Sequence, residues 1–424
     1  MLDIRLIRDD PESVKSRLAS RGPGSDAAID EILECDTERR RLETVLQQLN
    51  GDRNRLSKEI GQRKSRGEPT AELEDKVRSF SHEIADINRL ADEAGELQRD
   101  LLLRVPNLPH PNVPIGSDAT HNPVVRVWGA KPEVAAKGRD HVEIAARLGL
   151  LDLDRAAKIS GSGFICFTGA GAALERALIN FMLDLHTRAH GYLEISPPFL
   201  VRRDCMVGTT QLPKFEEDMY ALENGQLFLA PTAEVPVTNL HREEILPAGD
   251  LPKKFVAYTP CFRREAGSAG RETRGLIRVH QFDKVELVKI TAPENSYDEL
   301  EKLTADAEAV LQLLGLHYRV IELCTGDIGF GSAKTYDIEV WAPGQNAYLE
   351  VSSCSNFEDF QARRMNLKFK HPAGKNQFCH TLNGSGTALP RLFVALLETH
   401  YCRGALPIPE PLQKYMGASL LSPK

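Results

Sequence analysis

The chain has 424 residues, a formal net charge of −7 and 27% charged residues, which fits a globular protein of two domains. Its apolar runs are shorter than the roughly 20 residues that cross a bilayer, and "MLDIRLIRDD" has no signal-like apolar core, so we expect a cytoplasmic protein with no membrane partner. The eight cysteines form no Cys-x-x-Cys motif, which argues against a zinc site.

Residues 1–25 predict a short folded lead-in. Asp10 is placed to cap a helix, Pro11 suits its first turn, and Gly22 suits the stop that follows it.

Two long apolar stripes follow, and both have the spacing of a coiled coil. The first comprises Leu42, Val45, Leu49, Leu56 and Ile60, and the second comprises Leu73, Val77, Phe80, Ile84, Ile87, Ala91, Ala94, Leu97 and Leu101. The break "GQRKSRGEPT" between them predicts an antiparallel helical hairpin. Its first helix, Ile29–Lys64, would be about 50 Å long at 1.5 Å per residue, too long for a globular core.

Cations gather near the tip of this hairpin although the chain is acidic. They are Arg53, Arg55, Lys58, Arg63, Lys64 and Arg66, and Glu59 is the one acid among them. Two interpretations stay open, namely a solvated helix face and a surface that contacts nucleic-acid phosphates.

The segment "VPNLPHPNVPIG", residues 105–116, has the proline content of a linker. It separates an N-terminal domain, residues 1–104, from a second domain, residues 117–424. In the second domain short strand-like runs alternate with helical segments, and the phosphate-binding glycine motifs of parallel α/β folds are missing. This pattern favours an α+β fold on an antiparallel sheet.

A predicted strand, "PKKFVAYTPCF", ends in Arg263-Arg264-Glu265, and a basic loop and a second strand follow it. Strand alternation would place Arg263 and Glu265 on one face and Arg264 on the other. A guanidinium group fits a phosphate or carboxylate, and a carboxylate beside it can accept a hydrogen bond from an amine. On these residues alone, a surface hairpin with salt bridges is the alternative.

Two further stretches offer ligand-binding chemistry. Glu350 with Ser352 and Ser353 supplies hard oxygen atoms of the kind that hold Mg²⁺ beside phosphates. In "NGSGTALPR", Gly384 and Gly386 predict a turn into a helix that begins near Arg391, and helix N-termini attract anions.

Together these motifs resemble those of class II aminoacyl-tRNA synthetases. Phe-Arg-x-Glu resembles motif 2, Gly-x-Gly…Arg resembles motif 3, and "GYLEISPPFLV", after a helix at Ala173–His190, resembles motif 1. With "GTTQLPKF", "PTAEVPVTNL", "AKTYDIEVW" and the coiled-coil arm, the chain is similar to bacterial-type seryl-tRNA synthetases over nearly its whole length. The resemblance implies an antiparallel-sheet catalytic domain behind an N-terminal coiled-coil hairpin.

The resemblance also implies a reaction and its residues. ATP with Mg²⁺ would convert L-serine to seryl-adenylate, and serine would pass to the 3′ end of serine tRNA or, in this family, selenocysteine tRNA. The implied ATP-binding residues are Arg263, Arg264, Glu265, Glu350, Val351, Ser352, Ser353 and Arg391, of which Arg263 and Arg391 are catalytic and Glu350 and Ser353 hold the metal. The implied serine-binding residues are Thr232, Ala233, Glu234, Arg263, Glu286, Asn383 and Ser385.

The tRNA would contact the arm cations together with Arg271 and Arg274, and motif 1 would form a homodimer.

Six positions depart from the family pattern: Gly163, Thr168, Thr210, Thr387, Pro390 and Leu392. They motivate an alternative, a second-copy enzyme that resists an inhibitor or supplies activated serine to a biosynthetic carrier. The retained Arg263, Glu265 and Arg391 argue against a non-catalytic paralogue.

Overall fold

The computed structural model describes residues 1–133, 140–266 and 275–423. The chain forms two compact units. The first consists of Met1–Ala19 and Pro23–Pro106, and the second of Ser20–Gly22 and Asn107–Lys424. In the described ranges, no helix combines the length and apolarity that spanning a membrane requires.

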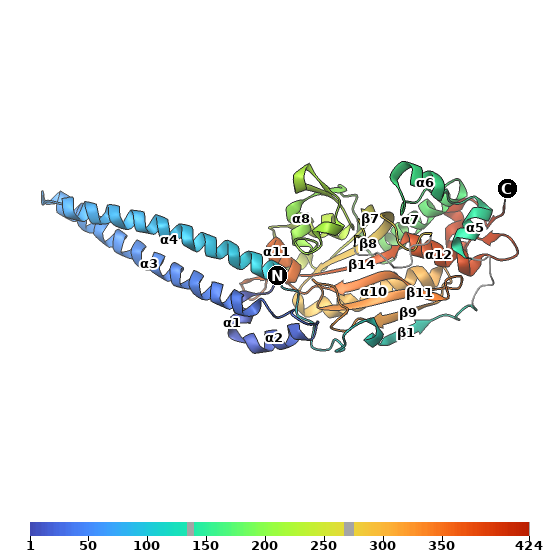
Figure 1. The fold of residues 1–424 in the computed structure, drawn as a ribbon, viewed down its shortest axis with the longest axis horizontal. Helices are drawn as coiled ribbons and strands as arrows, with labels where there is room; N and C mark the ends of the chain where they lie inside the picture. Colours follow the sequence, from blue (N-terminus) through green and yellow to red (C-terminus); the bar gives the residue numbers. More distant parts are fainter. Residues whose placement is uncertain (134–139, 267–274, 424) are drawn as a thin grey trace. The chain divides into compact units, whose positions relative to one another are not determined.

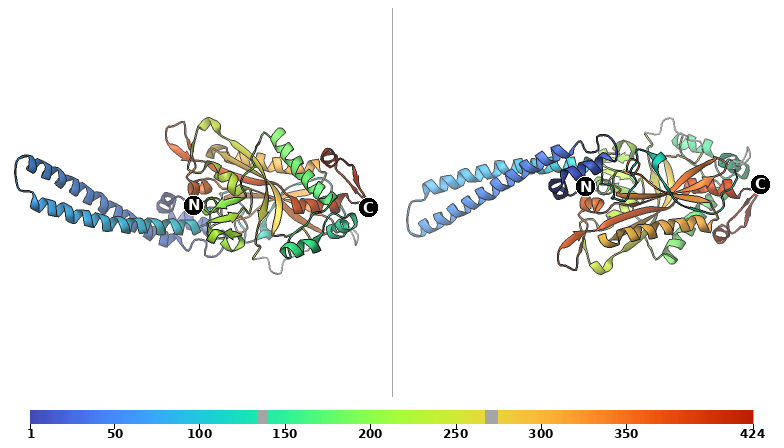
Figure 2. Two further views of the ribbon diagram at one scale, coloured as in Figure 1. Left: turned by 90° about the horizontal axis from the view of Figure 1, so that it is seen from above. Right: turned by 90° about the horizontal axis from the view of Figure 1, so that it is seen from below.

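The first unit is helical, with α1 (Ile4–Asp9), α2 (Pro11–Ala19), α3 (Ile29–Ser65) and α4 (Ala71–Arg104). As predicted, Asp10 caps α2, because its Oδ1 accepts a hydrogen bond from the Ser13 backbone N–H at 3.1 Å. Helices α3 and α4 run side by side as an antiparallel hairpin in every view (Figures 1 and 2). The predicted coiled-coil hairpin is therefore confirmed, whereas the short α1 was not predicted.

One position of the predicted seam is wrong. Leu97 is 51% exposed, and the neighbouring Gln98 is buried with 7% exposure. A step of four from Ala94 reaches Gln98, and a step of three then reaches Leu101, so Gln98 continues the heptad. A polar residue occupies the seam here because it has a buried partner, Asp36.

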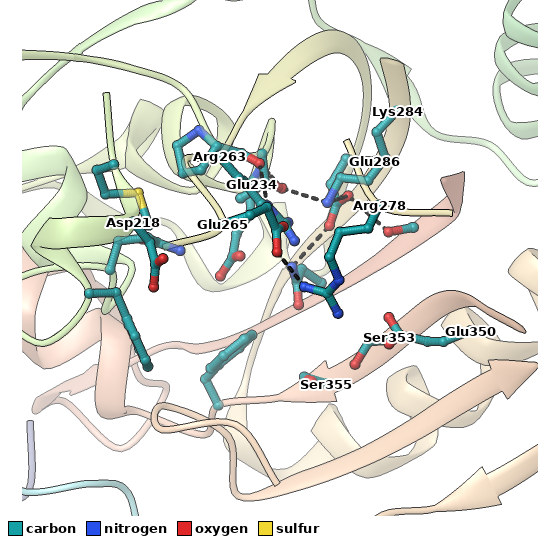
Figure 3. A pocket seen from close by; sticks show the side chains of 18 residues that line it. Asp218, Glu234, Arg263, Glu265, Arg278, Lys284, Glu286, Glu350, Ser353 and Ser355 are labelled. Carbon is teal, nitrogen blue, oxygen red and sulfur yellow. Dashed lines mark hydrogen bonds and ion pairs between the residues drawn. The ribbon is translucent and has the colours of Figure 1, made fainter. Parts of the chain in front are cut away.

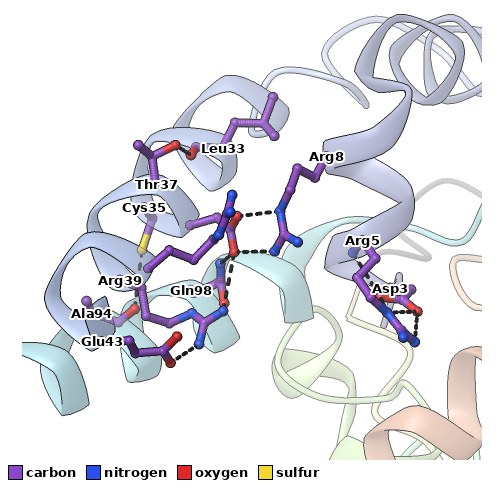
Figure 4. A network of polar contacts seen from close by, with 12 residues as sticks. Asp3, Arg5, Arg8, Leu33, Cys35, Thr37, Arg39, Glu43, Ala94 and Gln98 are labelled. Carbon is purple, nitrogen blue, oxygen red and sulfur yellow. Dashed lines mark hydrogen bonds and ion pairs between the residues drawn. The ribbon is translucent and has the colours of Figure 1, made fainter. Parts of the chain in front are cut away.

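Asp36 joins three helices at the base of the hairpin through its bonds to Arg8 and Gln98, two residues that Figure 4 labels. It lies on α3 and is 1% exposed. Its carboxylate accepts hydrogen bonds from Arg8 of α1 (Nε–Oδ2 2.8 Å and Nη2–Oδ1 3.0 Å) and from Gln98 of α4 (Nε2–Oδ1 3.0 Å). Burial by itself would raise the pKa of Asp36, but these bonds outweigh it and hold that pKa below its usual value.

We predict that Asp36→Asn loosens the base of the hairpin by about 2–3 kcal/mol, because it leaves the Arg8 guanidinium without its anion. In the unaltered chain, the ionised Asp36 carboxylate contributes this stability at neutral pH. The contribution is lost as the pH falls below about 4, because Asp36 has a lower pKa in the folded state than in the unfolded state and is finally protonated in both. Hydrogen exchange of α1 and of the adjoining turns of α3 and α4 measures both effects. Asp30→Asn, which alters an exposed carboxylate paired with Lys15, is the control. Equal exchange in the two variants would contradict the prediction.

The second unit is built on an eight-stranded sheet with the order β1-β9-β10-β11-β14-β8-β7-β2 (Figure 1). The strands are β1 (Val124–Trp128), β2 (Leu193–Glu194), β7 (Lys253–Phe262), β8 (Gln281–Thr291), β9 (Tyr318–Glu322), β10 (Lys334–Ala342), β11 (Ala347–Asn356) and β14 (His380–Ala388). Every neighbouring pair is antiparallel except β2 with β7. The predicted antiparallel α+β class is confirmed.

Helices cover one face of the sheet and leave much of the other open. Helices α7 (Ala170–Arg188), α10 (Ser296–Leu313) and α12 (Leu389–His400) contact the sheet, and α7 contacts both of the others. On β8, Val285 and Leu287 join the core beneath these helices. The alternate residues face the opposite side, where α9 (Glu234–Thr238) and α11 (Phe360–Met365) cover Val288 and Ile290. Lys284 and Glu286 therefore face away from α7, α10 and α12, on the same side as Val288 and Ile290.

Shorter elements surround this sheet. The helices are α5 (His141–Leu148), α6 (Leu153–Ser160), α8 (Arg203–Gly208) and α13 (Glu410–Met416). The small sheets are formed by β3 (Leu200–Arg202), β4 (Ala221–Leu222) and β5 (Leu227–Leu229), by β6 (Ile245–Leu246), β12 (Lys368–Lys370) and β13 (Asn376–Phe378), and by β15 (Leu406–Pro407) and β16 (Leu420–Leu421).

The proline-rich segment packs as part of the second unit from Asn107 onwards. The buried Asn107 side-chain amide donates to the backbone carbonyls of Gly331 (3.0 Å) and Phe357 (2.9 Å). The guanidinium of Arg21 donates to four carbonyls of the same unit, those of Asn107, Ile328, Gly329 and Ser332, and burial lowers its pKa to about 10. The segment therefore has the composition of a linker, but from Asn107 onwards it is hydrogen-bonded to the second unit.

Candidate active site

A polar cavity of about 720 Å³ lies on the open face of the sheet (Figure 3). Its wall includes Glu286 of β8, Ser353 of β11 and Ser385 of β14, together with Thr232 and Glu234 at the start of α9. A smaller cavity of about 210 Å³ adjoins it and shares Arg263, Glu265, Arg278, Lys284, Glu350 and Ser385 with it. The two cavities thus form one continuous polar site.

Glu286 lies at the centre of the larger cavity and is 1% exposed. Its carboxylate accepts hydrogen bonds from Asn383 Nδ2 (2.9 Å) and Ser385 Oγ (3.3 Å), because Ser385 faces Glu286 in the β14–β8 register. Lys284 Nζ lies 2.6 Å from Glu286 Oε2 and donates to Thr232 Oγ1 at 2.8 Å. Sequence reasoning missed Lys284, although the Lys-x-Glu spacing of a strand places both side chains on one face.

Glu234 is a second buried carboxyl group in this cavity. Burial and the nearby charge of Glu286 raise the pKa of Glu234 to about 7, while a hydrogen bond from Gln361 Nε2 (2.7 Å) opposes the increase. Its protonation therefore changes near neutral pH. Ala233, its neighbour, belongs to the apolar core beneath α9.

The Arg263-Arg264-Glu265 triplet lies just beyond β7, which ends at Phe262, so it is not part of the strand. Arg263 Nε donates to the Pro231 carbonyl at 3.2 Å, and its guanidinium lies over the Phe282 ring at 5.2 Å. Arg263 and Glu265 line both cavities, whereas Arg264 lines a separate depression beside Glu216 and Glu217. The predicted division of the triplet is present, but a loop with Glu265 at φ 52° produces it.

Arg278 is a cation of the site that sequence reasoning did not single out. It lines both cavities, and its Nη1 forms a short ion pair with Glu265 Oε2 (Figure 3). The available signal was its place in the same arginine-rich stretch, four residues before Phe282. Arg271 and Arg274 of that stretch lie outside the described residues.

A β-bulge brings Glu350 and Ser353 to the same face. In a regular strand residues three apart point to opposite faces. Here Ile338 pairs with Ser352 and Glu339 with Glu350, so Val351 is an extra residue on β11. Val351 lines the smaller cavity, and the buried Ser352 hydroxyl donates to the Ser385 carbonyl at 2.6 Å.

The predicted glycine-flanked turn before Arg391 is wrong. Gly384, Ser385 and Gly386 lie inside β14, which has a register shift between Ser385 and Thr387. The strand then leads directly into α12, whose first turn carries Arg391. Arg391 Nε donates to the Ile277 carbonyl at 3.2 Å, and its Nη1 donates to the Glu350 carbonyl at 2.8 Å.

Hard oxygen atoms around Glu350 fit a divalent cation. The Glu350 carboxylate is half-exposed in the cavity, and Ser353 pairs in register with Asp337 of β10. Among the described residues, Asp337 Oδ1 is buried without a hydrogen-bond partner. Burial and the charge of Glu350 raise the pKa of Asp337 well above its usual value. In the described ranges, His, Cys, Asp and Glu side chains form no group of three or more that could hold a metal ion.

Of the six positions that depart from the family pattern, only Pro390 lines either cavity. Thr387 Oγ1 contacts Met182 Sδ and Leu392 is in the helix-covered core, so both face away from the site. Gly163 packs on His280, where an added Cβ would lie 2.6 Å from the ring. Thr210 has φ 74°, and Thr168 Oγ1 donates to the Gly149 carbonyl at 3.0 Å.

Comparison with known proteins places this site in a family. Residues 1–109 match the seryl-tRNA synthetase N-terminal domain, and residues 215–400 match the tRNA synthetase class II core domain (G, H, P, S and T). The chain is 59% identical to serine–tRNA ligase of Akkermansia muciniphila and 53% identical to that of Carboxydothermus hydrogenoformans, over 100% of each chain.

A solved structure is similar as well. The crystal structure of seryl-tRNA synthetase from Pyrococcus horikoshii complexed with ATP is 40% identical, with a TM-score of 0.93 over 100% of both chains. Because relatives at this identity align from end to end, the chain belongs to the seryl-tRNA synthetase family.

Proposed function

We propose that the larger cavity binds L-serine, that the smaller one with the shared wall binds ATP, and that the two react to seryl-adenylate before serine passes to the 3′ end of serine tRNA. The observation that carries this proposal is the buried Glu286 cluster in a cavity that Arg263 also lines, next to the smaller cavity that Arg263 and Arg391 line. The relatives named serine–tRNA ligase support the ligase reaction and do not favour supply of a biosynthetic carrier. We propose a cytoplasmic location because charged tRNA is used there by ribosomes.

The serine cavity is suited to a small polar amino acid. Glu286 and Glu234 can accept hydrogen bonds from the serine ammonium and hydroxyl groups, and Thr232 and Ser385 offer further hydroxyls. Alanine would leave buried acceptors unpaired, which allows strong discrimination without an editing step.

The activation step needs positioned charge more than acid or base chemistry. A serine carboxylate oxygen attacks the α-phosphorus of ATP, a new P–O bond forms, and the bond to pyrophosphate breaks. Arg263 sits where the cavities meet and can neutralise the reacting carboxylate and phosphate. Arg391 can hold the outer phosphates, and Glu265 can accept from the adenine amino group.

We also propose that Glu350 and Ser353 hold Mg²⁺, next to Asp337, the register partner of Ser353, whose Oδ1 has no hydrogen-bond partner among the described residues. When bound, the ion would neutralise phosphate charge. No zinc ligand set is proposed.

Serine-dependent ATP–pyrophosphate exchange tests the function. We expect strong exchange with L-serine and exchange at least about 100-fold weaker with alanine or threonine. EDTA should abolish the exchange, and added Mg²⁺ should restore it.

Glu286→Gln should raise the serine KM about ten- to a hundredfold with little change in the ATP KM. Glu322→Gln, on the same sheet but paired with Lys334 and outside both cavities, is the control. Equal exchange with threonine would overturn the serine assignment.

A homodimer is supported by apolar side chains around the motif 1 segment. Leu193 of β2 is 61% exposed and Leu200 of β3 is 49% exposed, and Phe199 between them is exposed too. Strand β2 is also an edge of the large sheet, with backbone groups open to pairing. A second copy of the chain would cover both features.

We predict a sedimenting mass of about twice 47.1 kDa at micromolar concentration. Leu193→Glu with Leu200→Glu should shift the chain toward the monomer, because each charge would be buried in the interface. Ile115→Glu alters another exposed apolar residue and should leave the mass unchanged. A fully active monomer of the unaltered chain would contradict the dimer.

The arm cations divide into two groups. Arg55 pairs with Asp52 (2.9 Å), Arg63 with Glu59 (2.6 Å) and Lys64 with Glu74 (2.8 Å). Within the described residues, no acidic oxygen lies within 4.0 Å of the charged nitrogens of Arg53, Lys58 or Arg66. We propose that the tip contacts the phosphates of serine tRNA, chiefly through these three cations.

Replacing Arg53, Lys58 and Arg66 together by Gln should weaken tRNA charging at physiological salt and reduce the slope of log affinity against log salt by about 2–3. Pyrophosphate exchange should stay unchanged, because every residue of the two cavities lies in the second unit. Gln at Arg40, Arg89 and Arg99, exposed cations elsewhere on the hairpin, is the matched control. Deleting residues 28–101 should abolish tRNA charging and leave pyrophosphate exchange intact. Normal tRNA charging after either change would show that the tip cations do not contact tRNA and only face the solvent.

A further inference from the structure

Helix α12 holds the backbone segment 275–278 at two points. Arg391, in its first turn, donates directly to the Ile277 carbonyl. Glu398 lies seven residues later, two turns along the same side of the helix, and reaches the segment through a histidine. The smaller cavity is lined by Leu276, Ile277 and Arg278, so both contacts act on its wall.

The second contact is a buried relay through His141 of α5. His141 is 1% exposed, and its Nδ1 lies 3.0 Å from Glu398 Oε1, which also accepts from the His141 backbone N–H at 3.0 Å. The Leu276 backbone N–H donates to His141 Nε2 at 3.3 Å. Since Nε2 is the acceptor, the ring proton lies on Nδ1 and is donated to Glu398.

The Glu398 carboxylate is itself held in place. Its Oε2 accepts from the Gly344 backbone N–H at 2.8 Å, and its Oε1 accepts from Gln345 Nε2 at 2.8 Å. The ring orientation of His141 is therefore set by several bonds and not by its own rotamer alone.

The segment also packs directly on the histidine ring. Gly275 has φ +69°, and a Cβ added there would lie 2.2 Å from His141 Nε2. A backbone this close cannot shift toward the ring, and the hydrogen bond from Leu276 resists a shift away from it. The ring thus fixes the backbone from which Ile277 bonds Arg391 and Arg278 pairs with Glu265.

We infer that His141, oriented by Glu398, is a positioning residue for the ATP side of the reaction: it sets the wall that holds Arg391 and Arg278. The inference rests on the proposed function for its ligand, ATP. It assigns His141 no contact with the reacting atoms.

Two substitutions separate the two ring nitrogens. In His141→Gln, the side-chain oxygen can reach the place of Nε2 and accept from Leu276. In His141→Asn, the shorter amide can still donate to Glu398 from the place of Nδ1 but cannot reach Leu276. We expect His141→Asn to raise the ATP KM in pyrophosphate exchange about five- to tenfold, the effect of one ordinary hydrogen bond, with the serine KM unchanged. His141→Gln should restore most of the loss.

His400→Asn is the matched control, because His400 is a partly buried histidine at the far end of α12 that bonds the Leu314 carbonyl away from both cavities. Calorimetry of ATP binding without serine gives a second readout. If the unaltered chain does not activate serine, the proposed function is contradicted, but the effect of His141 on ATP binding can still be measured. If His141→Asn does not fold, Gly275→Ala tests the same contact. Equal ATP KM values for the Asn and Gln variants, or equal increases for serine and ATP, would overturn the inference.

Discussion

The carboxylate of Glu286 is the constraint around which the site is arranged. An ionised carboxylate on a sheet, almost without solvent, costs several kcal/mol unless neighbouring groups replace its hydration. Lys284, Asn383 and Ser385 do so, and all three come from β8 or from β14, the strand paired with it. Lys284 is two residues from Glu286 on β8, whereas Asn383 and Ser385 depend on the β14–β8 register, so a slip of one residue would remove both β14 partners at once.

The same arrangement explains why neighbouring acids behave differently. Glu286 has a cation at hydrogen-bond distance, whereas Glu234 has the neutral amide of Gln361 and feels the charge of Glu286. Two neighbouring carboxyl groups repel each other when both are ionised, and a further cation lowers that cost. The ammonium group of an amino acid is such a cation, so the charge of the cavity is complementary to that of its proposed ligand.

Local periodicity made much of the fold predictable. The hairpin follows from heptad spacing, and the strand that leads to Arg263 follows from a short apolar run between turn residues. Leu97 was wrongly assigned to the coiled-coil seam because it is apolar, although the heptad spacing points to Gln98. The hydrogen bond that allows Gln98 to be buried there is made with Asp36, which lies on another helix. Fewer than half of the residues that line the two cavities were named as site residues from the sequence, several of them through the family resemblance alone. Lys284, Arg278 and His141 were not named. The Lys-x-Glu spacing was an available signal for Lys284, whereas the importance of His141 depends on Glu398, 257 residues away.

The bulge at Val351 shows that backbone pairing can carry information that residue identity does not. The extra residue lets Glu350 and Ser353 share a face of β11 although they are three positions apart. Many side chains could occupy position 351 without changing this pairing. If Val351 instead paired as an ordinary strand residue, alternation would turn Glu350 away from the cavity, although every residue of the site would still be encoded. In this strand, the irregular register is therefore as much a part of the site as the side chains that it presents.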